Sequence, residues 1–334
     1  MAVITELSHT VIENALEQYD IGKLMRFKPA TQGIENTNYF ITTRSSENGQ
    51  SVLKDYVFTV VEELGGDAIS RQIMVSLLSD CNEAGLPVPV LVRTKHGDRE
   101  CRAWDKPILI CEKLPGAHIT HPVVENCEAI GRFLARFHLV TRTIASKAKP
   151  YIRNVDWLTR SVETVEPFVS PDQRFYLRKV LEVLTSLLSR TDVQSLPQSV
   201  IHGDLFRDNA LFNSHGLSGV VDFYHAGVGY EIYDIAVAIN DWCEHHGTID
   251  ERRASSLLSA YNQIRPLTGL EATFLNQFLL YGAFSFWLSR LLIQVRDELP
   301  DDYPVKDPRH FEELVDRHLR RPFRLTEPET ITVK

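Results

Sequence analysis

Short apolar runs and two amphipathic stretches organise the first 114 residues of the chain. Residues 8–18 and 67–84 carry apolar positions at helical spacing, and Gly85 with the prolines that follow it ends the second stretch. Runs rich in β-branched and aromatic residues predict five strands, at 23–31, 37–43, 51–62, 90–92 and 107–112. The turn at Asn48 and Gly49 predicts a hairpin between the second and third strands. We therefore expect an α+β lobe built on a mainly antiparallel sheet.

Helical spacing dominates the rest of the chain. The predicted helices cover 128–143, 174–188, 230–245, 251–265 and 270–298. Three short apolar runs, at 199–201, 210–212 and 219–221, interrupt this region and predict strands. No repeat or low-complexity linker separates the two parts. We therefore expect an N-terminal lobe at residues 1–114 and a mostly helical C-terminal lobe at 115–334, with a cleft between them.

Polar residues follow the three short runs at the points where the predicted strands end. His202, Asp204 and Asn209 lie in the turn between the first two runs, and Asp222 follows the third. The pattern His-x-Asp-x-x-x-x-Asn with a later strand-borne Asp is a variant of the protein-kinase catalytic loop and metal-binding Asp. The alternative is a turn rich in Asp and Asn that contains a buried histidine. The second strand-end Asp favours the catalytic interpretation.

Phosphoryl transfer to a hydroxyl requires this set of groups. Asp204 is the predicted catalytic residue, which faces the acceptor hydroxyl and takes its proton. Asn209 and Asp222 are the predicted Mg²⁺ ligands, because Mg²⁺ prefers hard oxygen donors. His202 is predicted to support the loop rather than to act as a base, since Asp204 already occupies the place of the base.

Several segments in this order resemble homoserine kinases of the aminoglycoside phosphotransferase and choline kinase-like superfamily. They are 33–40, 84–89, 205–209, 222–224, 240–243 and 286–291. The resemblance implies a protein-kinase-like two-lobe fold, ATP and Mg²⁺ as cofactors, and phosphorylation of the L-homoserine hydroxyl, a step toward threonine. Alternatives are a related kinase acting on choline, an aminoglycoside or another amino alcohol, and an inactive kinase fold that serves as a binding module.

The resemblance also assigns an ATP site to the N-terminal lobe. The loop before the first hairpin would cover the phosphates, and the connector at 110–114 would meet the adenine. The ATP-binding residues expected on this basis are Gly33, Glu35, Asn36, Thr37, Thr59, Glu112 and Leu114. As a motif the loop is weak, because a plain surface hairpin turn fits the same residues. Thr59 stands where kinases usually have a lysine, and Lys54 could replace that lysine only if the strand began earlier.

An amino-acid acceptor requires an anion for its ammonium group and a cation for its carboxylate. Asp241 and Arg290 are the candidates, because each lies in an otherwise apolar helical stretch. The alternative is that these two residues pair with each other as a structural ion pair. Tyr224 and Trp242 are candidates for the pocket walls, and aromatic core packing is their alternative.

The composition of the chain indicates which classes of partner the protein binds. The net charge of −8 argues against general nucleic-acid binding, and the apolar stretch at 279–295 is too polar for a membrane span. We therefore expect a small-molecule substrate, with neither nucleic acid nor membrane as partner, and the oligomeric state stays open. Five scattered cysteines and an acidic N-terminus without a signal peptide predict a cytoplasmic protein with reduced thiols. A zinc site at Cys243, His245 and His246 lacks a matching second cluster.

Overall fold

The computed structural model describes residues 5–30, 36–62, 68–296, 306–321 and 323. The described chain forms two compact units. The first, the sheet unit, contains residues up to 116 together with 218–224, and the second, the helical unit, contains 117–217 and the described residues after 224. The segment 218–224, which carries Asp222, therefore belongs to the sheet unit although the predicted N-terminal lobe ended at residue 114.

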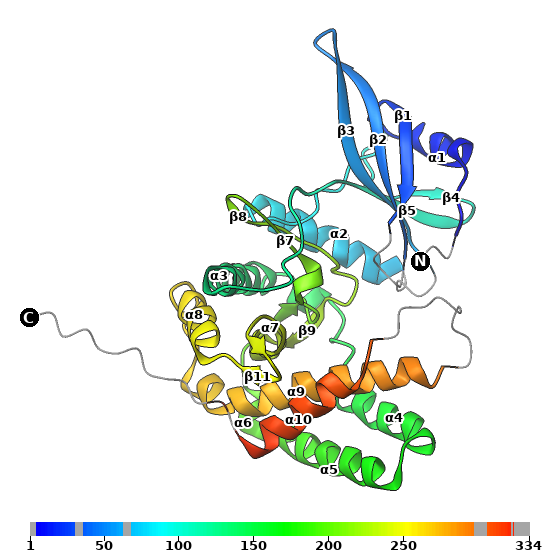
Figure 1. Cartoon of the computed structure of the whole chain (residues 1–334). Helices are drawn as coiled ribbons and strands as arrows, with labels where there is room; N and C mark the ends of the chain where they lie inside the picture. Colours follow the sequence, from blue (N-terminus) through cyan, green and yellow to red (C-terminus); the bar gives the residue numbers. More distant parts are fainter. Residues whose placement is uncertain (1–4, 31–35, 63–67, 297–305, 322, 324–334) are drawn as a thin grey trace, which may run out of the picture. The chain divides into compact units, whose positions relative to one another are not determined.

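A five-stranded antiparallel sheet forms the sheet unit, in the order β1-β2-β3-β5-β4 (Figure 1). Its strands are β1 (Lys23–Pro29), β2 (Thr37–Glu47), β3 (Gln50–Val60), β4 (Cys101–Ala103) and β5 (Lys106–Glu112). The β2–β3 hairpin keeps an unbroken register, and Asn48 and Gly49 both take positive φ angles at its turn. The predicted antiparallel sheet and its first hairpin are confirmed.

One strand prediction is wrong. Residues 90–92 form no strand, although Leu91 bridges to Cys111 and two backbone hydrogen bonds join this segment to β5. The strand that the sequence analysis missed is β4, which pairs with β5 through a tight turn in which Trp104 and Asp105 take positive φ angles. Two prolines precede residues 90–92, and proline cannot donate to a ladder, so this segment is poorly suited to extend the sheet.

Helix α1 (His9–Leu16) begins at the capping residue Ser8 and packs on β1. Its Ile12 and Leu16 join a buried cluster with inward-facing strand residues such as Ile41 and Phe58. Helix α2 (Ala68–Glu83) is also part of this unit. The strands therefore bury one face of the sheet against α1, and the side chains of the opposite face lie outside this cluster.

Helices make up most of the helical unit (Figure 1). They are α3 (Val124–Thr141), α4 (Val155–Val165), α5 (Pro171–Leu188), α6 (Thr191–Gln194), α7 (Glu231–Trp242), α8 (Glu251–Asn262), α9 (Gly269–Gln294) and α10 (Arg309–Arg320). Helix α3 packs on α8, while α4, α7 and α10 pack on α9. Neighbours on several sides explain why α9 is apolar around its whole circumference between Phe278 and Leu288. Helices α4 and α10 were not anticipated from the sequence.

Short strands carry the turn identified in the sequence. Strand β6 (Gln198–Ile201) pairs with β9 (Gly227–Tyr230), and β7 (Ala210–Asn213) pairs with β8 (Gly216–Val220). Two further short strands, β10 (Glu244–His245) and β11 (Thr248–Ile249), form a hairpin after α7. The three predicted strand runs at 199–201, 210–212 and 219–221 therefore fall at β6, β7 and the end of β8.

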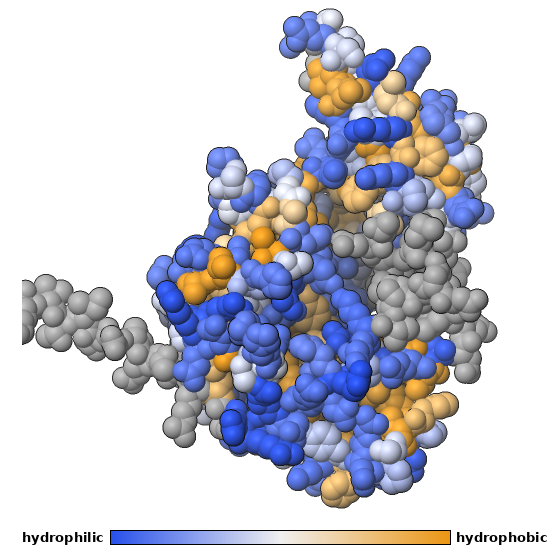
Figure 2. Space-filling view, viewed as in Figure 1, coloured by the Kyte–Doolittle hydropathy of each residue, from blue (hydrophilic) through white to orange (hydrophobic). Residues whose placement is uncertain are grey.

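The surface of the helical unit is mixed. On the side shown in Figure 2 most of this unit is hydrophilic, with apolar side chains in small groups. Phe168 and Phe175 are among its exposed large apolar residues. Over the described ranges, no helix combines the length and apolar character that crossing a bilayer requires.

Candidate active site

The loop between β6 and β7 holds the predicted catalytic residues. It begins at His202 after β6 and ends with a short 3-10 helix, η4 (Arg207–Asn209). Gly203 takes a φ of 73°, and a Cβ at this position would lie 2.2 Å from the ring of Tyr151. Only glycine fits this conformation and this close approach without displacement of the tyrosine. The sequence His-Gly-Asp thus places Asp204 immediately after a tight backbone turn.

A buried carboxylate from α7 fixes this turn. Asp234 accepts a hydrogen bond from the backbone N–H of His202 at 2.8 Å and from that of Gly203 at 2.7 Å. Burial alone would raise the pKa of Asp234, but the hydrogen bond and charge of His138, together with His202 and the Gly203 N–H, lower it. The ionised carboxylate therefore holds the start of the catalytic loop from behind.

Helix α3 supports the same anchor. His138 places Nε2 at 3.2 Å from Asp234 Oδ2 and Nδ1 at 2.8 Å from the hydroxyl of Tyr261. Thr141, one turn later, donates to the carbonyl of Val200 in β6 at 2.8 Å. His138 is therefore a buried histidine whose two ring nitrogens both have hydrogen-bond partners. Asp234 itself was missed, although a carboxylate between Tyr233 and Ile235 carries the same sequence signal as Asp241.

Asn209 contacts Asp204 directly. Its Nδ2 donates to the Asp204 backbone carbonyl at 2.7 Å and to the Asp204 carboxylate at 3.2 Å. No group in the described part of the chain donates to Oδ1 of Asn209, and this oxygen is not among the buried unpaired atoms. The amide is thus oriented by its nitrogen and keeps an oxygen for another ligand. A hard cation such as Mg²⁺ fits this donor.

Asp222 lies in the sheet unit, just after β8. It takes a φ of 68°, a left-handed conformation that is uncommon for a residue with a side chain. Such conformations cost roughly 1–3 kcal/mol and are concentrated at functional sites. The preceding strand is held by a hydrogen bond from the Val220 N–H to the carbonyl of Pro87 at 2.7 Å. The backbone therefore places Asp222 in a strained conformation just after a strand, and its role as a metal ligand stays a prediction.

The sheet face opposite the α1 core carries the predicted nucleotide residues of β3. Tyr56, Phe58 and Val60 point into the core, so the alternation of the strand turns Thr59 to the other face. Thr59 donates from its hydroxyl to Asn38 Oδ1 at 2.6 Å. Lys54 has the opposite parity from Thr59 and is exposed toward the hairpin end. Lys54 and Thr59 therefore cannot face the same ligand across this strand.

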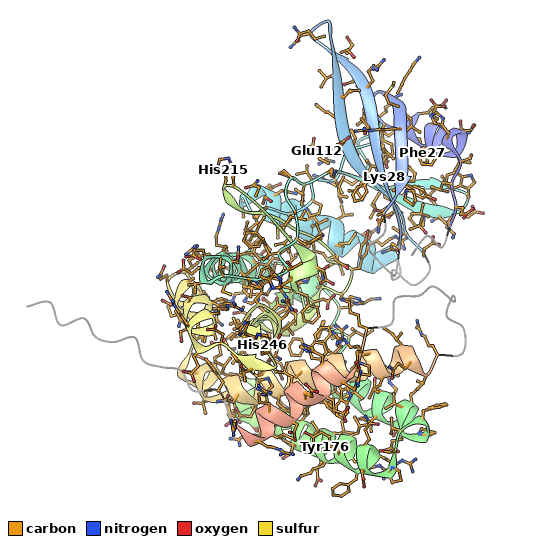
Figure 3. All side chains as sticks on the ribbon, in the orientation of Figure 1. Phe27, Lys28, Glu112, Tyr176, His215 and His246 are labelled. Atoms are coloured by element: carbon orange, nitrogen blue, oxygen red, sulfur yellow. The ribbon has the colours of Figure 1, made fainter. Side chains whose placement is uncertain are left out.

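Two lysines that the sequence analysis overlooked lie on this second face. Lys28 and Lys113 place their Nζ atoms 5.7 Å and 5.3 Å from the centre of the Phe40 ring. Lys113 immediately follows Glu112, the exposed last residue of β5, and Figure 3 labels both Lys28 and Glu112. These lysines supply positive charge to a face where Thr59 provides none.

The other residues predicted to bind ATP lie in the segment before β2, at the start of β2 and in the connector after β5. Gly33 and Glu35 lie outside the described residues. Asn36 is buried and accepts the backbone N–H of Glu62 through Oδ1 at 3.1 Å, while Thr37 donates to the Glu62 carboxylate at 2.7 Å. Leu114 lies half-buried in the connector after β5. Their assignment to ATP stays a prediction.

Asp241 and Arg290 do not pair with each other. Asp241 accepts the backbone N–H of Arg207 at 2.7 Å and binds the guanidinium of the same residue, with Nε at 3.2 Å. Burial raises the pKa of Asp241 although Arg207 opposes this effect. Arg290 instead donates to the carbonyl of Asp307 at 2.6 Å and stacks over Phe311. The alternative of an Asp241–Arg290 ion pair is therefore wrong, and both roles in acceptor binding stay predictions.

The two aromatic candidates differ in position. Trp242 is fully buried, and its indole N–H donates to the carbonyl of Leu205 at 3.0 Å, which corresponds to the core-packing alternative. Tyr224 is half-buried in the sheet unit. Trp242 therefore supports the catalytic loop from within the helical unit.

Arg153 is a charged residue of this region that the sequence analysis did not identify. It lies just before α4 and is only 8% exposed. Its Nη1 donates to the hydroxyl of Tyr151 at 2.6 Å, and that hydroxyl donates to the carbonyl of Gly203 at 2.8 Å. A guanidinium thus lies two hydrogen bonds from the catalytic turn. Arg153 follows a polar stretch with no helical periodicity, so no sequence pattern marked it.

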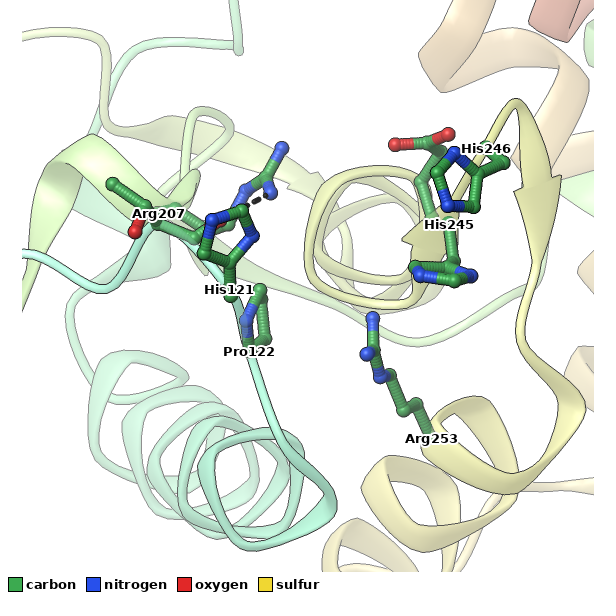
Figure 4. A pocket seen from close by; sticks show the side chains of 8 residues that line it. His121, Pro122, Arg207, His245, His246 and Arg253 are labelled. Atoms are coloured by element: carbon green, nitrogen blue, oxygen red, sulfur yellow. Dashed lines mark hydrogen bonds between the residues drawn. The ribbon is translucent and has the colours of Figure 1, made fainter.

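A cavity of about 530 Å³ is lined in part by Arg207 (Figure 4). Three histidines, two arginines and a glutamate contribute to its lining: His121, Arg207, Glu244, His245, His246 and Arg253. Ion pairs with Asp241 and Asp250 balance both arginines. Within the described ranges, no group of three or more His, Cys, Asp or Glu side chains is arranged to hold a metal ion.

Comparison with known proteins relates this arrangement to a family. Residues 26–267 match the model of the phosphotransferase enzyme family. The homoserine kinase of Cupriavidus pinatubonensis is 34% identical over 325 residues, which cover 96% of each chain. The homoserine kinase of Pseudomonas aeruginosa is 35% identical, over 93% of this chain and 95% of that protein.

Solved structures agree in fold. An amicoumacin kinase superposes with a TM-score of 0.71 at 17% identity, over 93% of this chain and 94% of that one. A microcompartment-associated aminopropanol kinase gives 0.61 at 15% identity, over 93% and 98% of the two chains. The expected α+β, protein-kinase-like fold is thereby confirmed. With family match and near full-length similarity combined, the chain belongs to the phosphotransferase enzyme family and, within it, to the homoserine kinases.

Proposed function

We propose that this protein transfers the γ-phosphoryl group of ATP to the hydroxyl of L-homoserine, giving ADP and O-phospho-L-homoserine. The observation that carries the acceptor is the 34–35% identity to homoserine kinases along nearly the whole chain. The geometry of the loop at 202–209 supports the reaction class, because it presents a carboxylate and a metal-suited amide oxygen side by side.

In this proposal Asp204 orients the acceptor hydroxyl and takes its proton as the bond to phosphorus forms. Asn209 uses its nitrogen to hold Asp204 and its Oδ1 to bind Mg²⁺, and Asp222 supplies a second, charged oxygen. When bound, Mg²⁺ neutralises charge on the phosphates. His202 is a positioning residue, since its backbone N–H is held by Asp234 and its Nδ1 accepts the Asp204 N–H at 3.3 Å.

The nucleotide is proposed to bind the sheet unit on the face opposite α1. Thr59 and Leu114 line this site, and Glu112 precedes the connector whose backbone meets the adenine. Lys28 and Lys113 supply the cationic charge that the usual kinase lysine would provide. The predicted contributions of Gly33, Glu35, Asn36 and Thr37 to phosphate covering belong to the same proposal. The five cysteines are free, which supports a cytoplasmic location.

A coupled ADP-release assay tests the acceptor. The expected result is turnover with L-homoserine that exceeds turnover with L-serine, L-threonine and choline by at least about 10²-fold in kcat/KM, because a site built for one polar substrate rejects analogues that leave its groups unpaired. A preference for choline or another amino alcohol would assign the protein to a different acceptor. Absence of ADP release with every acceptor would contradict kinase activity itself.

A further inference from the structure

Arg153 is buried without a carboxylate partner. In the helical unit its guanidinium is bounded by the rings of Phe286, Trp157 and Tyr151, with the centre of Phe286 at 4.4 Å. Its hydrogen bonds go to neutral hydroxyls, with Nη1 at 2.6 Å from Tyr151 and Nε at 3.2 Å from Ser289. Among the residues that the structure describes, no Asp or Glu forms an ion pair with Arg153.

Other deeply buried charges in this unit are paired. Arg265, which is 4% exposed, binds both Glu231 and Glu271, the latter at 2.7 Å. A buried cation without a bonded carboxylate keeps the capacity to bind an anion that a paired one has already used. Arg153 therefore differs from Arg265 in having no carboxylate among its hydrogen-bond acceptors.

Hydrogen bonds and ring contacts connect Arg153 to the loop that carries Asp204. Tyr151 links its guanidinium to the Gly203 carbonyl, and Gly203 is bonded to Asp204. Phe286 beneath the guanidinium contacts Phe206 of the same loop, with ring centres 4.5 Å apart. Burial would lower the pKa of Arg153, but Tyr151, Tyr233 and Asp204 outweigh this effect and raise it. The guanidinium thus lies within the electrostatic reach of the catalytic carboxylate.

We propose that Arg153 binds the α-carboxylate of the amino-acid acceptor and so makes the enzyme select an amino acid over a simple amino alcohol. This inference rests on the proposed function, since it concerns the acceptor of the same site. In homoserine four bonds separate the hydroxyl oxygen from the carboxyl carbon, a span of about 5 Å when extended. In this proposal the hydroxyl of the substrate meets Asp204 while its carboxylate meets Arg153. A guanidinium offers two parallel donors to a carboxylate, which adds orientation to charge.

Arg153 suits this role better than Arg290, the cation selected from sequence. Arg290 already donates to the Asp307 carbonyl and stacks on Phe311 at 4.3 Å. Burial lowers the pKa of Arg290, although Asp241, Asp307 and Asp208 oppose this effect, so three carboxylates already surround it. These carboxylates would repel a further anion from a substrate. Arg153 instead donates to neutral hydroxyls, and Asp204 is the carboxylate that acts on it.

The test pairs a variant with an acceptor that lacks the carboxylate. The acceptors are L-homoserine and 3-aminopropan-1-ol, which is homoserine with hydrogen in place of the carboxylate. The wild type should show a large ratio of kcat/KM for the first over the second. Arg153→Met should reduce this ratio by about 10²–10³-fold, through a higher KM for homoserine with kcat little changed. Turnover of 3-aminopropan-1-ol, which has no carboxylate for Arg153 to bind, should fall far less than turnover of homoserine.

Two comparisons make the result decisive. Arg153→Lys keeps the charge but loses the paired donors, so its ratio should lie between those of the wild type and Arg153→Met. Arg290→Met tests the other candidate cation, and thermal unfolding confirms that each variant is folded.

If Arg290→Met lowers the ratio strongly and Arg153→Met does not, the carboxylate-binding cation is Arg290. If Arg153→Met lowers turnover of both acceptors equally, Arg153 supports the loop through Tyr151 and the inference is wrong. A wild type inactive toward homoserine would instead refute the proposed function.

Discussion

Replacing the carboxylate behind the catalytic loop tests how this enzyme holds its reacting groups. In Asp234→Asn the side chain keeps its shape but loses its charge and one acceptor oxygen. One of the two loop N–H groups, those of His202 and Gly203, must then face the amide nitrogen. Hydrogen bonds to a charged group contribute about 1.5–3 kcal/mol each, and breaking one buried charged network costs about 3–5 kcal/mol. For a unit of about 200 residues, a loss of about 3–5 kcal/mol predicts an unfolding midpoint lower by roughly 6–20 °C.

The pH dependence of the same variant follows from the sign of the pKa shift. Burial would raise the pKa of Asp234 above its ordinary value of 3.8. The hydrogen bond and charge of His138 more than offset this effect, so the pKa is lowered. The stabilisation is therefore complete above the unfolded-state pKa and is lost as the pH falls through the lower folded-state pKa. Thermal unfolding followed by circular dichroism should show a constant gap between wild type and Asp234→Asn from about pH 5 to 8. This gap should narrow only below about pH 4.

Activity supplies the second measurement for this variant. Because Gly203 and Asp204 are adjacent, loosening the turn should lower kcat more than it changes the KM for ATP. Asp192→Asn is a matched control, since Asp192 pairs with Arg190 on the surface at 2.7 Å and should show no measurable change in midpoint or kcat. The reasoning would be refuted if Asp234→Asn unfolded with the wild type at every pH and kept its kcat.

Two further predictions concern the reacting groups. Asp204→Asn should keep ATP binding and lower kcat and kcat/KM together by about 10²–10⁴-fold, the range typical of a lost general base. A change confined to the KM of the acceptor would instead make Asp204 a binding residue. Asp222→Ala should abolish turnover, and Asn209→Ala should weaken it but recover in excess Mg²⁺, because water replaces a neutral amide oxygen more easily than a charged one. Activity assays across a Mg²⁺ titration distinguish the two variants, and wild-type activity in both would place the metal site elsewhere.

Local sequence patterns predicted the structure correctly where it depends on a few neighbouring residues. The turn at Asn48 and Gly49 requires positive φ angles, and both residues adopt them. The spacing from Asp204 to Asn209 predicted that the two would share a turn, and the amide now donates to the carboxylate. Such features depend on a few neighbouring residues, so the rest of the fold alters them little.

Patterns failed where a partner distant in the chain decided the outcome. Residues 90–92 have strand-like composition, yet they make only a short bridge beside Ile110–Glu112, whereas Cys101–Ala103 pairs with the start of β5 because a tight turn joins the two. Pairing of Asp241 with Arg290 was the alternative to their roles in acceptor binding, whereas the fold pairs Asp241 with Arg207. An apolar surrounding reveals that a charge needs a partner, but the partner can lie anywhere in the sequence.

The sequence by itself indicated the reaction class, through a loop of eight residues that carries Asp204 and Asn209 and a strand end that carries Asp222, whose roles in the reaction stay predictions. Tertiary structure decided what holds that loop in place and which cation is left unpaired beside it. Asp234 reaches the loop from a helix about thirty residues later, and Arg153 reaches it through Tyr151 from a segment about fifty residues earlier. The physical reason is that burial removes water as a partner, so each buried charge depends on neighbours that only folding brings together.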